Sequence, residues 1–373
     1  MTTDGRFSDA DRAFMRRALF VAERGRGRTS PNPIVGAVVV TPEGIVAGQG
    51  AHLRAGGAHA EVHALAEAGP RARGATLYCT LEPCAHEGRT PPCAPQVAAA
   101  GIARAVIAMV DPNPRVAGRG IELLRGRGVV VDAGLCEEEA RRVNAPFVTW
   151  ITERRPHVTL KIAQSEDGIV GLRGERLKLT GAAMDRLMHR QRAEVDAMAV
   201  GSGTLLADDP LLTPRGAFRE RPLTRVVFDW RLRCTSPRRL YGTLDAGPVL
   251  IVTTDAARQA QQAAADALAA RGLEVLALPA RDLSLALARL GERGVVSLLI
   301  EGGPTLQDAF AEADLVYLVQ TVIAVPVRLA GGAHPDALVF GPELGRLEGR
   351  LINPRWTSAG DDKLVEEDVH RAD

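Results

Sequence analysis

The fold of this chain is decided by two short segments, His59-Ala60-Glu61 and Pro83-Cys84-Ala85-His86-Glu87-Gly88-Arg89-Thr90-Pro91-Pro92-Cys93. One histidine and two cysteines are donors that a tetrahedral zinc site takes while it keeps a fourth position free for water. Glu61 is not needed as a ligand and is placed to carry protons. The segments therefore predict a zinc-dependent deaminase with His59, Cys84 and Cys93 as metal ligands and Glu61 as the catalytic residue.

Strands and short helices surround this motif in a regular alternation. Good helix formers follow His59 as far as Ala68, where Gly69-Pro70 stops the helix, and Cys93 begins a second helix. The alternation predicts an α/β unit with helices on both faces of a layered sheet. The elements expected in this half are a helix at 8–25, strands at 34–40 and 45–49, a helix at 59–68, a strand at 75–80, a helix at 93–100, a strand at 102–110, a helix at 121–127, a strand at 129–131 and a helix at 137–150.

Other histidines and cysteines near the motif leave alternatives open. His63 shares a helix face with His59 but lacks the residue order of zinc proteases, so we expect it to support the site or the fold. His86 could complete a closed structural zinc site, but four protein ligands would leave no position for water and Glu61 without a role. Cys79 lies on a predicted strand and is expected to be packed in the core.

The segment Arg154-Arg155-Pro156 interrupts the pattern, and a fresh strand begins at His157. We therefore expect two domains, residues 1–150 and 154–373. The charged segment 361–373 is expected to fray. The elements expected in the second half are strands at 157–163, 197–201, 225–229, 249–253 and 295–301, and helices at 184–194, 256–271 and 306–310.

Composition restricts the partners of the protein. Its 373 residues are enough for two hydrophobic cores. The 46 Lys and Arg residues nearly balance the 45 Asp and Glu residues, so the chain has no strong positive electrostatic field that would attract nucleic acid or an anionic membrane. No run of about 18 apolar residues could span a bilayer, and the N-terminus lacks the apolar core of a signal peptide. Five cysteines, an odd number, favour a reducing compartment, so we expect a cytoplasmic protein in which Cys136 and Cys234 are buried thiols.

Several longer motifs resemble a known family. The eight residues between Cys84 and Cys93 differ from the Cys-x-x-Cys spacing of cytidine and tRNA deaminases. The whole segment instead resembles the bifunctional deaminase/reductase family of riboflavin biosynthesis. The resemblance also rests on Pro31-Asn32-Pro33-Ile34-Val35-Gly36, Gly50-Ala51-His52, His59-Ala60-Glu61-Val62-His63-Ala64, Asp111-Pro112-Asn113-Pro114, Lys161-Ile162-Ala163-Gln164-Ser165-Glu166-Asp167-Gly168, Leu205-Leu206-Ala207-Asp208-Asp209-Pro210-Leu211-Leu212-Thr213 and Glu301-Gly302-Gly303-Pro304-Thr305-Leu306.

This resemblance implies a fold and two activities. The fold is α/β, with an N-terminal cytidine-deaminase-like three-layer αβα domain followed by a dihydrofolate-reductase-like α/β domain. The first activity is zinc-dependent deamination of 2,5-diamino-6-ribosylamino-4(3H)-pyrimidinone 5′-phosphate. The second is reduction of the ribosyl side chain to ribityl with NADPH. We expect Zn²⁺ and NADPH as cofactors, a small phosphoribosylated pyrimidine as substrate, and a homo-oligomer.

The resemblance also implies which residues bind the ligands. In the deaminase half they are Asn32, His52, Arg89, Asp111 and Asn113. The substrate residues of the reductase half are Arg192, Leu212, Arg215 and Glu301. Its cofactor residues are Ala163, Lys178, Thr204, Asp208, Gly303, Pro304, Thr305 and Leu306.

By themselves, the residues of the second half point to a cofactor less strongly. The turn at 301–305 follows an apolar run and precedes a helical pattern, and its glycines would let backbone N–H groups approach a phosphate. The chain lacks the Gly-x-Gly-x-x-Gly segment of dinucleotide-binding folds. The NADPH assignment therefore comes from the resemblance.

Departures from the family pattern lie in the reductase half and leave a second hypothesis open. Ile169 replaces the usual basic residue, Glu166 stands where leucine is usual, and Arg176 and Lys178 occupy a segment that usually carries Ser-x-Trp. The alternative is a deaminase whose C-terminal domain has lost reductase activity. A nucleic-acid-editing deaminase is disfavoured because the chain has only three Tyr and three Trp and no basic excess.

Overall fold

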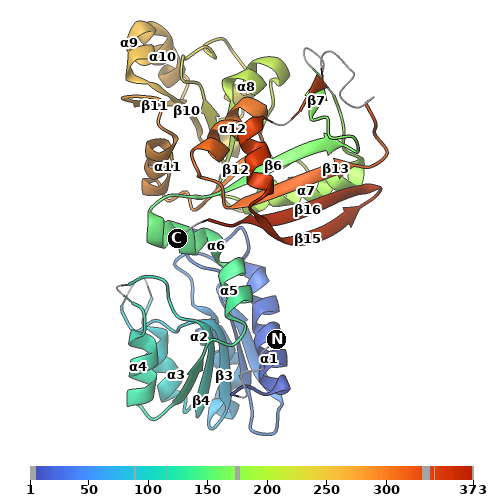
Figure 1. Ribbon diagram of the computed structural model, residues 1–373. Helices are drawn as coiled ribbons and strands as arrows, with labels where there is room; N and C mark the ends of the chain where they lie inside the picture. The colour runs from blue at the N-terminus through green and yellow to red at the C-terminus, as the bar shows by residue number, and fades with distance from the viewer. Residues whose placement is uncertain are drawn as a thin grey trace. The chain divides into compact units, whose positions relative to one another are not determined.

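The computed structural model describes residues 6–87, 90–114, 116–172, 177–329, 337–339 and 341–371 (Figure 1). The chain divides into two compact units, Met1–Arg154 and Arg155–Asp373. Every helix within the described ranges falls short of the length and apolar character that crossing a membrane requires.

The first unit is a five-stranded sheet in the order β2-β1-β3-β4-β5, with β2-β1-β3 antiparallel and β3-β4-β5 parallel. The predicted alternation of strands and helices is confirmed, and the first two strands pair as an antiparallel hairpin. The elements are α1 (Asp9–Ala22), β1 (Gly36–Val40), β2 (Val46–Ala51), α2 (Ala60–Ala68), β3 (Thr76–Leu81), α3 (Cys93–Ala99), β4 (Arg104–Met109), α4 (Arg119–Gly126), β5 (Val130–Ala133), α5 (Glu137–Val143) and α6 (Ala145–Glu153).

Two glycines show how helices cover both faces of this sheet. A Cβ atom at Gly36 would lie 2.0 Å from the Ala18 carbonyl oxygen of α1. A Cβ atom at Gly48 would lie 2.3 Å from the Ala64 carbonyl oxygen of α2. Gly48 pairs with Val39, and Gly36 is an odd number of residues away from Val39 along β1, so the two glycines face opposite sides. Helix α1 therefore covers one face and α2 the other, and α3 packs against α2 and α4 (Figure 1).

The helix that begins the first unit is held by a buried carboxylate. Ser8 and Asp11 form a capping box, in which Ser8 N–H donates to Asp11 Oδ2 at 2.9 Å and Asp11 N–H donates to Ser8 Oγ at 3.1 Å. Asp11 Oδ1 accepts from the Tyr78 hydroxyl and from Arg104 Nη1, each at 2.7 Å. Burial alone would raise the pKa of Asp11, but these hydrogen bonds outweigh burial and hold the pKa at about 2.

This lowered pKa gives a testable pH dependence. Because the folded-state pKa lies below the ordinary value, ionised Asp11 contributes about 2 kcal/mol of stability above pH 4, and the contribution is lost as the pH falls toward 2. We expect Asp11→Asn to lower the free energy of unfolding by about this amount at pH 7 and to weaken its dependence on pH between 4 and 2. Urea unfolding of parent and variant at several pH values measures both effects, and equal stability at pH 7 would contradict the assignment.

One helix predicted in the first unit is two helices. The segment 137–150 was expected to be continuous, but α5 ends at Val143 and α6 begins at Ala145. Pro146 has no N–H for the Arg142 carbonyl, and its ring would clash with that carbonyl in a continuous helix. Asn144 fills the break, accepting from Ile34 N–H at 2.7 Å and donating to the Ile34 carbonyl at 2.9 Å. Helix α6 continues to Glu153, beyond residue 150.

The second unit contains a nine-stranded mixed sheet in the order β11-β10-β9-β8-β12-β6-β13-β16-β15. The first seven strands of this order, from β11 through β13, run parallel to one another. Strand β16 is antiparallel to β13, and β15 is antiparallel to β16. The elements are β6 (His157–Ser165), β7 (Gly171–Leu172), α7 (Ala182–Glu194), β8 (Ala197–Gly201), α8 (Ser202–Asp208), β9 (Thr224–Phe228), β10 (Val249–Thr254), α9 (Asp255–Ala260), α10 (Gln262–Ala270), β11 (Glu274–Leu278), α11 (Leu283–Glu292), β12 (Ser297–Ile300), α12 (Pro304–Glu312), β13 (Leu318–Ala324), β14 (Ala337–Leu338), α13 (Pro342–Glu348), β15 (Leu351–Ala359) and β16 (Asp362–Val369).

Buried side chains on the two faces of this sheet form separate cores. Helices α11, α12 and α13 pack on one face, and α7, α8 and α10 on the other (Figure 1). Strands β8 and β12 are parallel neighbours, so their carboxyl ends, at Gly201 and Ile300, meet at one edge of the sheet. Ligands of open α/β sheets bind outside the carboxyl ends of the strands, so this edge is a candidate ligand site.

Two predictions for the second unit are wrong. The helix expected at 256–271 is interrupted at Gln261, whose backbone φ of −126° and ψ of 39° are not helical. The segment 361–373 was expected to fray, but β16 pairs with both β13 and β15. Its charges lie on a strand whose Leu364, Val365 and Val369 are buried, and Asp368 pairs with Arg355 at 3.0 Å. The strand is paired on both sides and buries apolar residues on both faces, which the net charge of the segment conceals, and this explains the error.

Candidate active sites

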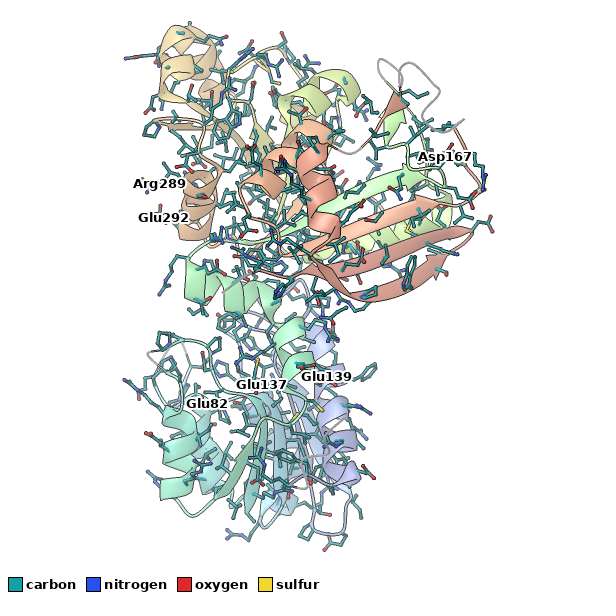
Figure 2. All side chains as sticks on the ribbon, viewed as in Figure 1. Glu82, Glu137, Glu139, Asp167, Arg289 and Glu292 are labelled. Atoms are coloured by element: carbon teal, nitrogen blue, oxygen red, sulfur yellow. The ribbon has the colours of Figure 1, made fainter. Side chains whose placement is uncertain are left out.

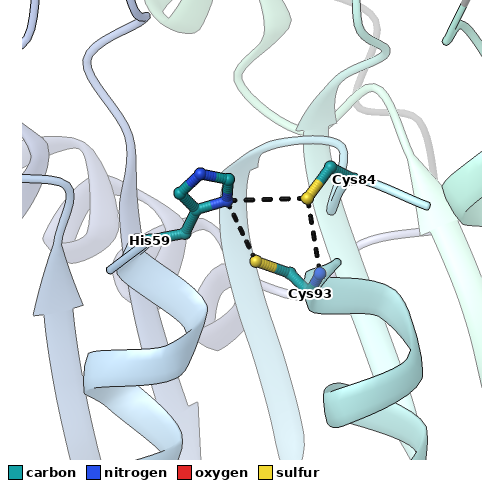
Figure 3. Close-up of side chains that lie close together, drawn as sticks. All are labelled: His59, Cys84 and Cys93. Atoms are coloured by element: carbon teal, nitrogen blue, oxygen red, sulfur yellow. Dashed lines mark hydrogen bonds between the residues drawn. The ribbon is translucent and has the colours of Figure 1, made fainter. Parts of the chain in front are cut away.

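His59, Cys84 and Cys93 lie together in the first unit, as Figure 3 shows. His59 is the N-cap of α2, Cys84 follows β3, and Cys93 is the first residue of α3. His59 Nδ1 lies 3.1 Å from Cys93 Sγ and 3.5 Å from Cys84 Sγ. The sheet edge and two helix starts thus bring three donor atoms within 4.8 Å of one another.

The donor set fits zinc. A tetrahedral zinc ion with Zn–N near 2.0 Å and Zn–S near 2.3 Å separates its ligand atoms by about 3.5 Å. The observed nitrogen–sulfur distances of 3.1 and 3.5 Å are close to that separation. Three protein donors leave one coordination position for water, which is the arrangement of catalytic rather than structural zinc sites.

The two thiols differ in acidity. The hydrogen bond from Cys93 is the main cause that lowers the pKa of Cys84, to about 4, and His59 lowers it further against the effect of burial. The same hydrogen bond to Cys84, together with burial, raises the pKa of the Cys93 thiol. Cys84 therefore ionises first, and its thiolate raises the pKa of His59 through their hydrogen bond. The charge of a bound zinc ion favours the thiolate form of both cysteines.

Glu61 is buried beside this cluster, in the first turn of α2, with an exposed fraction of 3%. The pKa of Glu61 is raised to about 7, mainly by burial and also by the Cys84 thiolate, against the lowering effects of the Glu61 backbone N–H, His59 and Cys93. A carboxyl group with a pKa near neutrality can both accept and donate a proton at physiological pH.

A cavity of about 400 Å³ opens beside the cluster and is lined by most of the predicted deaminase residues, namely Asn32, His52, His59, Glu61, Cys84, Asp111 and Asn113. Arg89 lies outside the described residues. His52 Nδ1 is 3.1 Å from the Ala58 carbonyl oxygen, so it donates there and leaves Nε2 to accept from Asn32 Nδ2 at 3.1 Å. Burial lowers the pKa of His52, which favours this neutral form.

The loop after β4 supplies a further wall of the cavity. Asp111 Oδ1 accepts from Asn113 N–H at 2.8 Å, and burial raises the pKa of the Asp111 carboxyl. Glu82, which the sequence reasoning missed, also lines the cavity, with both carboxylate oxygens accepting backbone N–H groups of this region. The cavity is also lined by Phe147 and Ile151 of α6, apolar residues that carried no motif.

The structure distinguishes the alternative zinc donors, His63 and His86, from the three predicted ligands. His63 is exposed, and His86, which lines the cavity, is exposed as well. Neither joins the group of His59, Cys84 and Cys93.

Cys79 and Cys234 are fully buried, as expected for packed thiols, whereas Cys136 is only partly buried.

The second unit has a larger cavity, of about 1030 Å³, at the carboxyl ends of β8 and β12. It brings together most of the residues that the family resemblance implied for the reductase half. They are Arg192, Thr204, Asp208, Leu212, Arg215, Glu301, Gly303, Pro304, Thr305 and Leu306.

An ion pair forms one wall of this cavity. Arg192 of α7 binds Glu301 in a bidentate way, with Nε–Oε1 at 2.7 Å and Nη2–Oε2 at 2.5 Å. Burial would raise the pKa of Glu301, but Arg192 and Lys161 outweigh burial and lower the pKa. Lys161, missed by the sequence reasoning, is a half-buried residue of β6, and burial lowers the pKa of its ammonium group despite the attraction of Glu301.

The backbone around this cavity has two features of ligand sites. Gly303 N–H donates to Thr204 Oγ1 at 3.1 Å, which joins the starts of α8 and α12. Leu212 is buried with a left-handed φ of 52°, a conformation that costs energy for a residue other than glycine. Such strain is concentrated at ligand sites.

Two of the implied cofactor residues do not line the cavity. Ala163 points to the other side of β6 from the core under α12 and packs beside Met184 and Val322. The Lys178 side chain is 75% exposed and pairs with Asp185 at 3.3 Å, while its neighbour Leu177 lines the cavity. Both residues therefore remain sequence-based proposals without support from the cavity.

The departures from the family pattern leave this cavity intact. Ile169 is fully buried, and its N–H donates to Ser165 Oγ at 3.0 Å, so it is a core residue. Glu166 pairs with Arg328 at 2.6 Å on the surface. Arg176 lies outside the described residues.

A third cavity, of about 890 Å³, adjoins the reductase cavity and shares Gly201, Gly203, Thr305 and Leu306 with it. Three arginines that carried no sequence motif surround it: Arg231, Arg233 and Arg281. Arg233 Nη2 donates to Ser202 Oγ at 2.6 Å. Asp229 is fully buried at its wall and has one carboxylate oxygen without a hydrogen-bond partner.

Comparison with known proteins agrees with both sites. Residues 8–109 match the family described as cytidine and deoxycytidylate deaminase zinc-binding region. Residues 156–346 match the RibD C-terminal domain. The first family supplies the zinc site, and the second is a NADPH-dependent reductase domain, so zinc and NADPH are the cofactors of this chain.

Relatives of known sequence or structure cover almost the whole chain. The chain is 40% identical to riboflavin biosynthesis protein RibD of Aquifex aeolicus over 84% of its own length and 88% of the relative. It is 39% identical to RibD of Escherichia coli, with 86% and 89% covered. The solved RibD structure of Acinetobacter baumannii matches with a TM-score of 0.83 at 32% identity, covering 97% of this chain and 99% of that one.

A solved diaminohydroxyphosphoribosylaminopyrimidine deaminase/5-amino-6-(5-phosphoribosylamino)uracil reductase from Thermotoga maritima has a TM-score of 0.80 at 30% identity, covering 96% of this chain and 99% of that one. The predicted fold class, a cytidine-deaminase-like domain followed by a reductase domain, is confirmed by these matches. The family resemblance inferred from the motifs is confirmed as well. With both domains and both cavities present in one chain, this protein belongs to the RibD family of bifunctional deaminase–reductases of riboflavin biosynthesis.

Proposed function

We propose that the first unit deaminates 2,5-diamino-6-ribosylamino-4(3H)-pyrimidinone 5′-phosphate and that the second reduces the ribosyl side chain of the product to ribityl. The observation that carries the proposal is the buried Glu61 beside three zinc donors, at a cavity lined by Asn32, Asp111 and Asn113. A cavity of about 400 Å³ suits a single pyrimidine with its sugar.

Glu61 is the proposed proton carrier of the deamination. Zinc, when bound, activates the water whose oxygen replaces the amino group. Glu61 accepts one proton from that water and delivers it to a ring nitrogen, and it then carries the second proton to the amino group, which leaves as ammonia while a ring carbonyl remains. Its pKa of about 7 suits both directions of transfer.

The polar residues of the cavity are the proposed substrate contacts. Asn32 and Asn113 offer amide donors and acceptors for the edges of the pyrimidinone ring, and Asp111 offers an acceptor for its amino groups. His52, held neutral by burial, fixes the amide of Asn32. Arg89 is proposed for the ribose phosphate because guanidinium binds phosphate in a bidentate way.

The proposed reductase site uses the cavity at the ends of β8 and β12. NADPH, when bound, supplies the hydride. Thr204, Asp208 and the turn 303–306 are the proposed cofactor contacts. Arg192, Leu212, Arg215 and Glu301 are the proposed substrate contacts, and the Arg192–Glu301 pair holds both side chains in one orientation.

The adjoining cavity is proposed for the adenosine half of NADPH. The two cavities share the lining residues Gly201, Gly203, Thr305 and Leu306, so the proposed ligand extends past these residues from one cavity to the other. Arg231, Arg233 and Arg281 offer the adjoining cavity guanidinium groups, beside the carboxylates of Asp229, Asp282 and Glu312, and guanidinium is the partner that the 2′-phosphate requires and that NADH does not need.

This assignment predicts a preference that can be measured without catalysis. We expect the parent protein to bind 2′,5′-ADP about tenfold or more tightly than 5′-AMP, because charge-assisted hydrogen bonds contribute 1.5 kcal/mol or more. Replacing Arg231, Arg233 and Arg281 together by alanine should bring the ratio close to one. Isothermal titration of both nucleotides measures it.

Arg289→Ala is the matched control for these substitutions. Arg289 is another exposed arginine of the second unit, on α11 and paired with Glu292 at 2.9 Å, and both are labelled in Figure 2. Its loss should leave the nucleotide preference unchanged. A triple variant that keeps the parental ratio would remove the three arginines from the proposed site.

A coupled assay tests the whole function against the deaminase-only alternative. Metal-replete protein is given the diaminopyrimidine substrate, and ammonia release and NADPH consumption are followed together. We expect ammonia first and one NADPH consumed for each ammonia. Ammonia without NADPH consumption, also after direct addition of the deaminated compound, would instead support the alternative.

We further propose a cytoplasmic homo-oligomer that does not bind nucleic acid. Support comes from the near balance of 46 basic and 45 acidic residues and from the free cysteines. Light scattering coupled to size-exclusion chromatography measures the mass. A mass of one chain at micromolar concentration would exclude the oligomer.

A further inference from the structure

The carboxylate of Glu82 is buried at the edge of the deaminase cavity and accepts four backbone hydrogen bonds. Its side chain belongs to the turn between β3 and Cys84, and Figure 2 labels it. The residue has an exposed fraction of 3%. A buried carboxylate requires compensating donors, and here backbone N–H groups supply them.

The four donors come from one region of the chain. Oε2 accepts from Asp111 N–H at 3.2 Å and from Gly118 N–H at 2.9 Å. Oε1 accepts from Gly120 N–H at 2.8 Å and from Ile121 N–H at 3.2 Å. Glu82 therefore binds the backbone at both ends of the segment between β4 and α4, which includes Asp111 and Asn113.

A close backbone approach reinforces this connection. A Cβ atom at Gly120 would lie 1.9 Å from the Pro83 carbonyl oxygen, so the start of α4 lies directly against the turn that leads to Cys84. Asp111 in turn accepts from Asn113 N–H at 2.8 Å. The backbone N–H of Asp111 is thus fixed by Glu82, and the Asp111 side chain fixes Asn113.

We propose that Glu82 is a positioning residue of the deaminase reaction, which holds Asp111 and Asn113 against the pyrimidine by binding their segment through its backbone. The inference rests on the proposed function, in which Asp111 and Asn113 contact the substrate. With four N–H groups on two oxygens, the Glu82 carboxylate is satisfied by the protein and does not act as a zinc ligand or a proton carrier.

Glu82→Gln tests the charge and the acceptors with almost no change of shape. The amide NH₂ of glutamine faces two backbone donors that an oxygen now binds, so two of the four hydrogen bonds are lost. We expect KM for the pyrimidine to rise about tenfold or more while kcat changes by less than about threefold, because the affected residues bind rather than react. Zinc content should remain at the parental value.

A second readout separates positioning from general stability. In Glu82→Gln, the amides of Asp111, Gly118, Gly120 and Ile121 should exchange hydrogen faster, while those of α2 keep their parental rates. Asp11→Asn is the control, because it removes another buried carboxylate of the same unit that lies outside the cavity. It should lower stability without raising KM. A rise of KM in the control equal to that of Glu82→Gln would overturn the proposal.

A double-mutant cycle with Asp111→Ala and Asn113→Ala distinguishes a failure of the positioning role of Glu82 from a failure of the proposed substrate contacts. If Glu82 acts through these side chains, its substitution should add little to KM once both are absent. A full additional rise would overturn the positioning role. No effect of the two alanine substitutions by themselves would instead overturn the proposed substrate contacts, whatever the exchange rates show. Glu82→Asp, which keeps the charge but shortens the reach, replaces Glu82→Gln if that variant does not fold.

Discussion

Replacing Glu61 by glutamine is expected to lower kcat of deamination by about 10²- to 10⁴-fold, the range that general acid–base catalysis contributes. Glutamine keeps the size of the side chain but cannot take up or release a proton near neutral pH. The fold should persist, because burial already raises the pKa of Glu61 to about 7 and an uncharged amide is no harder to bury. Ammonia release and zinc content, measured on one preparation, give both results.

Glu67→Gln is the control for this substitution. Glu67 lies on the same helix but is exposed, and its Oε2 accepts from Gln49 N–H at 2.9 Å. It should leave kcat within about twofold of the parent, as surface substitutions generally do. A Glu61→Gln protein that retains full activity with zinc bound would exclude Glu61 as the proton carrier.

Replacing Cys84 by serine is expected to remove zinc and, with it, deamination. The pKa of Cys84, lowered to about 4 mainly by the hydrogen bond from Cys93, makes it the more easily ionised of the two thiols. A serine hydroxyl does not ionise near neutral pH and binds zinc poorly, so zinc per chain should fall from about one to near zero. Atomic absorption after dialysis measures the metal.

The reductase activity of this variant provides an internal comparison. The second unit has its own cores, so NADPH consumption with added deaminated substrate should remain near the parental rate. Cys136→Ser is the matched control, because Cys136 is a partly buried thiol outside the zinc group and should keep both activities. Zinc retained at the parental stoichiometry in Cys84→Ser would contradict the ligand assignment.

Much of the first unit could be predicted because its signals are local. The N-cap position of His59, the turn after β3 and the start of α3 at Cys93 each follow from neighbouring residues. Once those elements form, the three donors must meet at one edge of the sheet. The breaks at Asn144 and Gln261 were missed because the apolar pattern continues across them, although Pro146 was a readable signal for the first.

The reductase half was less predictable because its site depends on distant pairs. Arg192 and Glu301 are 109 residues apart, and no spacing rule joins them. The roles implied for Ala163 and Lys178 had the same weakness. A motif gives the position of a residue on a strand or loop, but the direction of its side chain depends on the packing of the helices on each face.

The sequence by itself determined the family and predicted the zinc donors and the proton carrier, because the residues from His59 to Cys93 carry that side-chain chemistry at a fixed spacing. Only the tertiary structure decided how that site is supported. Glu82 binds backbone N–H groups of Asp111, Gly118, Gly120 and Ile121, and such groups are the same in nearly every residue. Because backbone N–H groups do not depend on the identity of the side chain, no sequence motif predicts which of them will bind Glu82. The structure shows these hydrogen bonds because it gives the positions of the backbone atoms, which the order of side chains does not reveal.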